Sequence, residues 1–173
     1  MIYSYKGKYP VIDSSAFIAQ NAVISGDVTI GKDASIWFHT VIRGDVSPTI
    51  IGDRVNIQDL SCLHQSPNTP LIIESDVTIG HRVTLHSCTI KKGALIGMDS
   101  TILDGAVIGE NSFIGAGSLV TPGTIIPPNS LAFGSPARVI RPTNEHDRSE
   151  MRRIVQDYVE KGKVYKEEVK KQS

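Results

Sequence analysis

The feature that most constrains this chain is an aliphatic residue that returns at every sixth position over most of its length. A period of six advances about 600° around an α-helix, so it cannot place these residues on one helical face. A triangular coil built from hexapeptides can bury them all, because each hexapeptide supplies one short strand and one corner. The positions are Ile12, Ile18, Ile24, Ile30, Ile36, Ile42, Ile51, Ile57, Leu63, Ile73, Ile79, Leu85, Ile90, Ile96, Ile102, Ile108, Ile114, Val120 and Ile126.

Two further positions of the repeat agree with this interpretation. A small or β-branched residue stands four positions after the aliphatic one, as at Ala34 and Ala106, where it would fit beside the buried ladder. Glycine often follows the aliphatic residue directly, as at Gly80 and Gly97, and we expect it to relieve the backbone at tight corners. An ordinary β-sandwich would not keep one residue type in phase for so long. We therefore predict an all-β parallel β-helix domain over residues 1–142, with an N-terminal lead-in and a closing segment.

The pattern changes after Pro142. Apolar side chains at Met151, Val155 and Tyr158 recur at helical spacing, and Asn144 or Thr143 precedes them as a candidate N-cap. The second unit, residues 143–173, is therefore predicted to form a C-terminal α-helix that packs on the coil or on a neighbouring chain.

Three interruptions of the repeat indicate where function lies. Ile42 to Ile51 contains three extra residues, Leu63 to Ile73 contains four extra, and Leu85 to Ile90 is one short. Loops that interrupt a regular solenoid tend to gather on one functional face.

Composition excludes several classes of partner. Acidic and basic residues balance at 18 each, so we expect no nucleic acid and no membrane as partner. No stretch approaches the roughly 20 apolar residues of a membrane span, and we expect a soluble, cytoplasmic protein. The two cysteines, Cys62 and Cys88, are too few for a disulfide framework and are predicted to be small buried residues.

Three histidines predict a metal site. His64 and His86 each follow a buried leucine and lie one coil apart, which stacks their rings at about 4.8 Å, the spacing of neighbouring strands. His81 lies near the previous corner, on the order of 15 Å from His86, so it cannot share their metal within one chain. A three-fold trimer resolves this, because a closed heterologous interface brings different faces of neighbouring chains together. Three histidines leave an open position, as in catalytic zinc sites.

Beyond these histidines, the residues resemble those of the γ-class carbonic anhydrases across nearly the whole chain. The matching stretches are Arg43-Gly44-Asp45, Asn56-Ile57-Gln58-Asp59, Gly80-His81, Leu85-His86 and Leu95-Ile96-Gly97-Met98. The resemblance implies a left-handed β-helix and a homotrimer, in which His64, His81 and His86 hold zinc, with iron or cobalt as alternatives.

The resemblance also implies roles for further residues. Gln58 would orient the metal-bound hydroxide, with Asn56 supporting it. Arg43 would pair with Asp45 or Asp59 across the subunit boundary and steer bicarbonate. Tyr158 in the C-terminal helix would approach the site. The acidic residues that export the proton in this family are missing, because Val46 follows Asp45 and the 65–71 loop has no carboxylate. Turnover is therefore expected to be slow.

The leading functional hypothesis is the reversible hydration of carbon dioxide to bicarbonate by a zinc-bound hydroxide at the subunit interface. A first alternative is an acyl-CoA thioesterase or acyltransferase, because the segment Phe133 to Ile140 resembles the end of the coil in hexapeptide acetyltransferases. A second alternative is a non-catalytic, metal-binding assembly protein.

Overall fold

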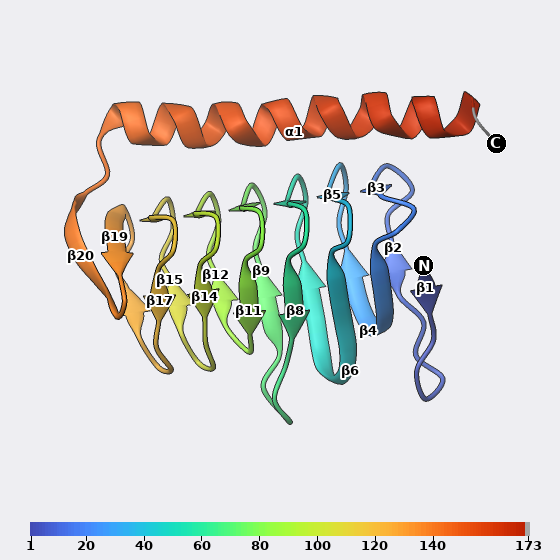
Figure 1. Cartoon of the computed structure of the whole chain (residues 1–173), viewed down its shortest axis with the longest axis horizontal. Coiled ribbons are helices and arrows are strands. Elements are labelled where there is room, and N and C mark those ends of the chain that lie inside the picture. Colours follow the sequence, from blue (N-terminus) through green and yellow to red (C-terminus); the bar gives the residue numbers. More distant parts are fainter. Residues whose placement is uncertain (172–173) are drawn as a thin grey trace.

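The computed structural model describes residues 1–171 and shows a parallel β-helix with one long helix along its side (Figure 1). Two sheets wrap around the coil, one of eight strands and one of twelve, and the larger sheet bends at β4 and β6 to cover two faces. The coil therefore has three faces. The predicted β-helix with hexapeptide repeats and a C-terminal helix is confirmed.

The helix face is the one that α1 covers. Its strands are β3 (Phe17–Ile18), β5 (Ser35–Ile36), β7 (Asn56–Ile57), β10 (Thr78–Ile79), β13 (Leu95–Ile96), β16 (Phe113–Ile114), β19 (Ser130–Gly134) and β20 (Ala137–Pro142).

The histidine face carries His64 and His86 at the ends of its strands. It comprises β1 (Ile2–Tyr3), the first parts of β4 (Val23–Ile30) and β6 (Val41–Ile51), and β8 (Cys62–His64), β11 (Thr84–His86), β14 (Thr101–Ile102) and β17 (Leu119–Val120). The third face comprises β2 (Val11–Ile12), the last parts of β4 and β6, and β9 (Leu71–Ile73), β12 (Thr89–Ile90), β15 (Val107–Ile108) and β18 (Ile125–Ile126).

The aliphatic ladder fills the interior of the coil. Residues from Ile24 to Ile126 at the sixfold positions are buried, and the small residues beside them, such as Ala106, are buried as well. Ile12 and Ile18 are only partly buried, because they belong to the first coil and have no coil stacked below them. The register confirms the repeat directly, since ladder residues pair with one another from coil to coil, as Ile79 does with Ile96.

The glycines after the aliphatic positions have a different role from the one predicted. Gly80 and Gly97 do not have the positive φ of a tight corner; that conformation falls at other residues, such as Arg82 and Asp99. A Cβ on Gly97 would instead lie 2.5 Å from the backbone nitrogen of Ala116 in the next coil. These glycines are needed because successive coils approach too closely there for a side chain.

Helix α1 (Glu145–Lys171) packs lengthwise on the coil of its own chain and contacts β3, β5, β7 and β10 (Figure 1). Its underside meets aromatic side chains, with the rings of Trp37 and Tyr165 5.1 Å apart. Gly162 lies at the contact, where a Cβ would meet the Cβ atoms of Phe17 and Ser35 at 3.4 Å. Within the described chain no helix is long and apolar enough to cross a membrane.

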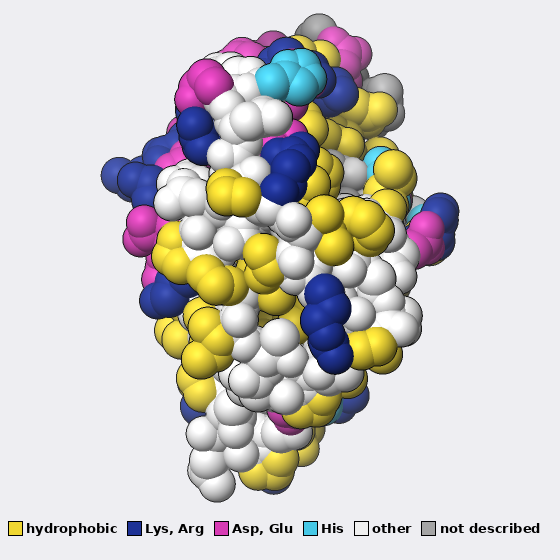
Figure 2. All heavy atoms as spheres, turned by 90° about the vertical axis from the view of Figure 1, so that its left-hand side faces the viewer, with side chains coloured by type: hydrophobic (Ala, Val, Ile, Leu, Met, Phe, Trp, Pro, Cys, Tyr) yellow, Lys and Arg dark blue, Asp and Glu magenta, His cyan; other side chains and the backbone are white. Residues whose placement is uncertain are grey.

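The antiparallel hairpin β19–β20 closes the end of the coil. Phe133, Val139 and Ile140 are each about half exposed on it, and hydrophobic side chains are visible over this end of the molecule (Figure 2). At the histidine face, Cys62 is exposed, whereas Cys88 is buried as predicted. Cys62 points outward because strand residues alternate sides and its neighbour Leu63 points inward.

Candidate metal centre

The ends of β8 and β11 bring two histidines together. His64 and His86 are register partners on adjacent strands, and their ring centroids lie 5.3 Å apart. The nearest ring nitrogens, His64 Nδ1 and His86 Nε2, are separated by 3.2 Å. Both rings are outward-facing and partly buried, because each follows a leucine that points into the core.

The other nitrogen of each ring contacts a carboxylate. His64 Nε2 lies 3.0 Å from Asp45 Oδ1, and His86 Nδ1 lies 2.7 Å from Asp104 Oδ1. An ionised carboxylate only accepts hydrogen bonds, so these two nitrogens carry the protons. When both rings are neutral, His64 Nδ1 and His86 Nε2 face each other with lone pairs, and a cation between them would accept both.

Hydrogen bonds keep both carboxylates ionised. Burial opposes ionisation of Asp45, but the hydrogen bonds from Arg43 and His64 outweigh it and lower the pKa of this carboxyl. The pKa of Asp104 is lowered by the hydrogen bond from the Ser66 hydroxyl and then by the one from His86.

The distance between the facing nitrogens fits one tetrahedral metal ion. Two nitrogens bound to zinc at about 2.0–2.1 Å and at a tetrahedral angle would lie about 3.3 Å apart, close to the 3.2 Å between His64 and His86. Ligating histidines in metal sites also donate their second ring nitrogen to a carboxylate or carbonyl. The donor set of this pair therefore fits zinc.

His81 stands at a different edge. It lies at the corner between the helix face and the histidine face, where its Nδ1 is 2.8 Å from Asp59 Oδ2. This contact leaves Nε2 of His81 available. Each of the three histidines thus has one ring nitrogen on a carboxylate and the other available for a metal. Over residues 1–171, no three His, Cys, Asp or Glu side chains of the single chain form a metal-binding group.

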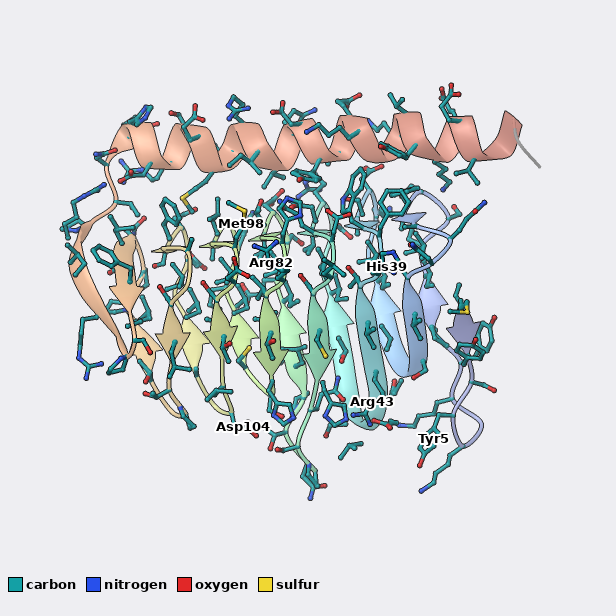
Figure 3. All side chains as sticks on the ribbon, in the orientation of Figure 1. Tyr5, His39, Arg43, Arg82, Met98 and Asp104 are labelled. Carbon is teal, nitrogen blue, oxygen red and sulfur yellow. The ribbon has the colours of Figure 1, made fainter. Side chains whose placement is uncertain are left out.

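Figure 3 shows the separation of the two edges. Arg43 and Asp104 lie at the lower rim of the coil, far from α1, whereas Arg82, the residue after His81, lies on the side of the coil toward the helix. The structure thus divides the predicted site into two groups. The first holds Arg43, Asp45, His64 and His86, and the second holds Asn56, Gln58, Asp59, His81 and Tyr158.

Arg43 pairs with Asp45 in this chain, at 2.7 Å between Nη1 and Oδ2. Of the two partners that the sequence left open, Asp59 instead contacts His81. The Arg43 guanidinium is half exposed, so it is available to a further anion.

The second group is ordered by a buried chain of amides beneath α1. Asn56 Nδ2 donates to Thr78 Oγ1 at 2.9 Å, and Gln58 Nε2 donates to Asn56 Oδ1 at 3.0 Å. Gln58 is 6% exposed. Because its side-chain nitrogen donates to Asn56, its side-chain oxygen is left to accept a hydrogen bond from another group.

Tyr158 packs above this region, with its ring 5.3 Å from that of Trp37. Burial raises the pKa of Tyr158, and the negative charge of nearby Asp59 raises it further. The Tyr158 hydroxyl therefore stays protonated at neutral pH.

Asp104, which contacts His86, and Ser66, which contacts Asp104, were not identified from the sequence. Leu85 pairs with Ile102, so Leu103 holds the position above His86 and Asp104 is one residue beyond it; the repeat alone therefore does not align Asp104 with this ring. Ser66 belongs to the inserted loop, for which the repeat predicts no position.

A separate cavity lies away from these residues. A groove of about 500 Å³ runs between α1 and the corners of the coil, with Arg54, Lys92 and Met151 in its lining. None of the predicted site residues lines it.

Comparisons with known proteins agree with this architecture. Residues 9–44 and 87–122 match the sequence family described as bacterial transferase hexapeptide (six repeats). A carbonic anhydrase of Geobacillus kaustophilus is 66% identical over 166 residues, covering 96% of this chain and 91% of that protein. The mitochondrial gamma carbonic anhydrase 1 of Arabidopsis thaliana is 37% identical over 146 residues, covering 81% of this chain and 53% of that longer protein. The solved structure of a candidate acetyltransferase from Bacillus cereus has a TM-score of 0.95 at 67% identity, with 96% of both chains covered.

The stacked coils and the matched repeats define a hexapeptide-repeat β-helix protein. Within that class the chain belongs to the γ-class carbonic anhydrase-like family, as the sequence resemblance indicated.

Proposed function

We propose that the chain forms a homotrimer with a zinc ion at each subunit interface and catalyses the reversible hydration of carbon dioxide. The observation that carries the proposal is the 3.2 Å approach of His64 Nδ1 to His86 Nε2, with a carboxylate at the opposite nitrogen of each ring. Iron or cobalt would suit the same three imidazoles. The names of the carbonic anhydrase relatives support the same reaction.

The histidine face suits a three-fold interface. Its outward-facing ladder carries no charge and consists of Val23, Val41, Cys62, Thr84, Thr101 and Leu119. The histidine pair lies at one edge of this face and His81 lies at the other. A ring of three such faces around one axis would bring His64 and His86 of each chain to His81 of the next, because the contact between the chains is heterologous.

The chain's own residues would then prepare the reaction. When bound, the metal supplies Lewis acidity, which brings the pKa of water near neutrality. Gln58 would accept a hydrogen bond from the attacking oxygen through its carbonyl oxygen, in an orientation fixed by Asn56. Arg43, exposed beside Asp45, would attract the bicarbonate anion. Tyr158 would serve as a hydrogen-bond donor, since its hydroxyl stays protonated.

The inserted residues offer no acidic side chain that could carry the proton away from this site. Val46 is exposed where an acid would be useful, and residues 65–71 carry no carboxylate. Turnover should therefore depend on added buffer, which can accept the proton directly. Raising the buffer concentration at fixed pH and ionic strength should increase the hydration rate.

A hybrid-trimer experiment tests the proposal. His64→Ala and His81→Ala should each abolish zinc binding and hydration in the pure variant. In an equal mixture of the two, about a quarter of all sites should be intact, because such a site needs its pair from one variant and its third histidine from the other.

The matched control mixes His64→Ala with His86→Ala. Each site takes both of these histidines from the same chain, so no mixture can rebuild one. Zinc content and carbon dioxide hydration are measured on anaerobically prepared, metal-loaded protein after the hybrids are shown to form. The interface site would be contradicted if zinc binding and hydration recovered equally in both mixtures, or if they recovered in neither mixture.

An acyl-CoA activity is the second candidate. It is favoured by the hairpin that closes the coil, where Phe133 is half exposed, and by the name of the Bacillus cereus relative. If both His64→Ala and His81→Ala still transferred the acyl group of acetyl-CoA to an acceptor, this would support an acyltransferase, and if both still hydrolysed the thioester, this would support a thioesterase. Zinc binding with neither activity would instead support an assembly protein.

A further inference from the structure

Asp104 connects one histidine of the pair to the inserted loop. It follows β14 at a corner of the coil, at the same lower rim as Arg43 (Figure 3). Its Oδ1 lies 2.7 Å from His86 Nδ1, and its Oδ2 accepts a hydrogen bond from Ser66 Oγ at 2.6 Å. Both oxygens of this carboxylate are therefore engaged in defined directions.

The inserted loop is itself held from a second side. The backbone nitrogen of Ser66 donates to Ser87 Oγ at 2.6 Å, and that hydroxyl donates to the carbonyl oxygen of Thr69 at 2.9 Å. Ser87 follows His86 directly, and its backbone nitrogen donates to the carbonyl oxygen of His64 at 3.1 Å. The loop, Asp104 and the histidine pair thus form one connected network.

We propose that Asp104 is a positioning residue of the metal centre, which fixes the tautomer and the ring orientation of His86 while Ser66 locks the carboxylate in place. This inference rests on the proposed function. A histidine that donates from Nδ1 keeps a lone pair on Nε2, and only that lone pair faces His64. The other tautomer would direct an N–H at His64 and leave His86 without a ligating nitrogen on that side.

The two carboxylates that contact the histidine rings, Asp45 at His64 and Asp104 at His86, are not equivalent. Asp45 shares its charge with the Arg43 guanidinium, whereas the second partner of Asp104 is the neutral hydroxyl of Ser66. The negative charge of Asp104 therefore acts mainly on His86, where it makes the imidazole a stronger ligand.

Four variants test the inference. Asp104→Ala should weaken zinc binding roughly 10- to 100-fold, the usual loss for a group that supports a metal ligand. Asp104→Asn should lose less, because its amide can still accept from His86 and donate to Ser66. Ser66→Ala should lose least. Asp13→Asn is the matched control, since Asp13 accepts the Ser15 hydroxyl at 2.7 Å but contacts no histidine.

Two measurements are needed. Zinc affinity is measured by competition with a chelator, and the tautomer of His86 is read from ¹⁵N chemical shifts of the imidazoles in the zinc-free protein at about pH 8.5, where free imidazole is neutral. Wild type and Asp104→Asn should show the Nδ1–H form of His86. Asp104→Ala should lose that preference while keeping the circular dichroism of the coil.

Wild-type zinc affinity in Asp104→Ala, or an Nε2–H form of His86 in the wild type, would overturn the inference. Failure of the proposed function looks different. If wild-type protein bound no zinc, the metal centre would be refuted, but the tautomer of His86 in the zinc-free protein would still report on Asp104.

Discussion

At the residue scale, neighbouring positions of the repeat differ sharply in burial. Ile108 at the end of β15 is fully buried, whereas Ile125 at the start of the adjacent β18 is 70% exposed. Alternation along a two-residue strand is enough to separate an interior side chain from a surface one.

This difference predicts unequal costs for the same truncation. Ile108→Ala should lower the free energy of unfolding by about 2–5 kcal/mol, because it removes buried methyl groups and leaves a cavity between stacked coils. Ile125→Ala should change it by less than about 0.5 kcal/mol. Urea unfolding at fixed protein concentration measures both, and equal losses would contradict the assignment of inward and outward positions.

The site residues were accessible to sequence reasoning to different degrees. His64 and His86 stack because the period and the strand spacing are regular, and both can be counted from the sequence. Asp104 lies a full coil away from His86 along the chain, and its link to Ser66 depends on the path of an irregular loop. No repeat specifies such a path.

At the element scale, the start of α1 is held by a reciprocal pair. Asn144 is the N-cap, with its Oδ1 accepting from the Asp147 backbone nitrogen at 2.9 Å, and Asp147 Oδ2 accepts from the Asn144 backbone nitrogen at 2.8 Å. Arg141 binds the same carboxylate. The hydrogen bond from Arg141 and then that from Asn144 lower the pKa of Asp147 to about 2.

A pH-dependent stability follows from this carboxylate. Its folded pKa is depressed below the ordinary 3.8, so its stabilisation is present above pH 3.8 and is lost as the pH falls toward about 2. Asp147→Asn should destabilise α1 by about 1–2 kcal/mol at pH 7, and the difference from wild type should shrink below about pH 4.

Helical circular dichroism during urea unfolding, compared between pH 7 and pH 3, measures this effect. The wild-type protein loses stability for other reasons at low pH as well, so the informative quantity is the gap between wild type and Asp147→Asn. A gap that stayed constant across this range would contradict the role of the ionised carboxylate.

At the scale of the whole molecule, the histidine face, whose outward-facing ladder from Val23 to Leu119 carries no charge, is the candidate trimer interface. Cys62 is exposed on this face in the single chain, while burial raises the pKa of the Cys88 thiol to about 12. Only Cys62 should therefore respond to assembly, because a buried and protonated thiol reacts poorly in either state.

A thiol-labelling experiment uses this contrast. The assembled protein should label slowly at both cysteines, whereas Thr101→Arg, which places a charge on the histidine face, should give a smaller species with one fast thiol per chain. Thr89→Arg is the matched control, because Thr89 faces outward on the third face. Rapid labelling of Cys62 in a wild-type trimer would exclude this face as the interface.

The sequence by itself determined the coil, its hydrophobic ladder, the helix after Pro142 and the stacking of His64 on His86. These features depend on a translational period, which fixes the side of the coil that each residue faces. The outward position of Cys62 followed from the same alternation, although it was expected to be buried.

Only the tertiary structure decided how separate coils and elements meet. It showed that Gly97 is required by the close approach of Ala116, that α1 packs on its own coil with Gly162 at the contact, and that Asp104 joins His86 to Ser66. Such contacts depend on distances between segments far apart in the chain, and a six-residue period carries no information about them.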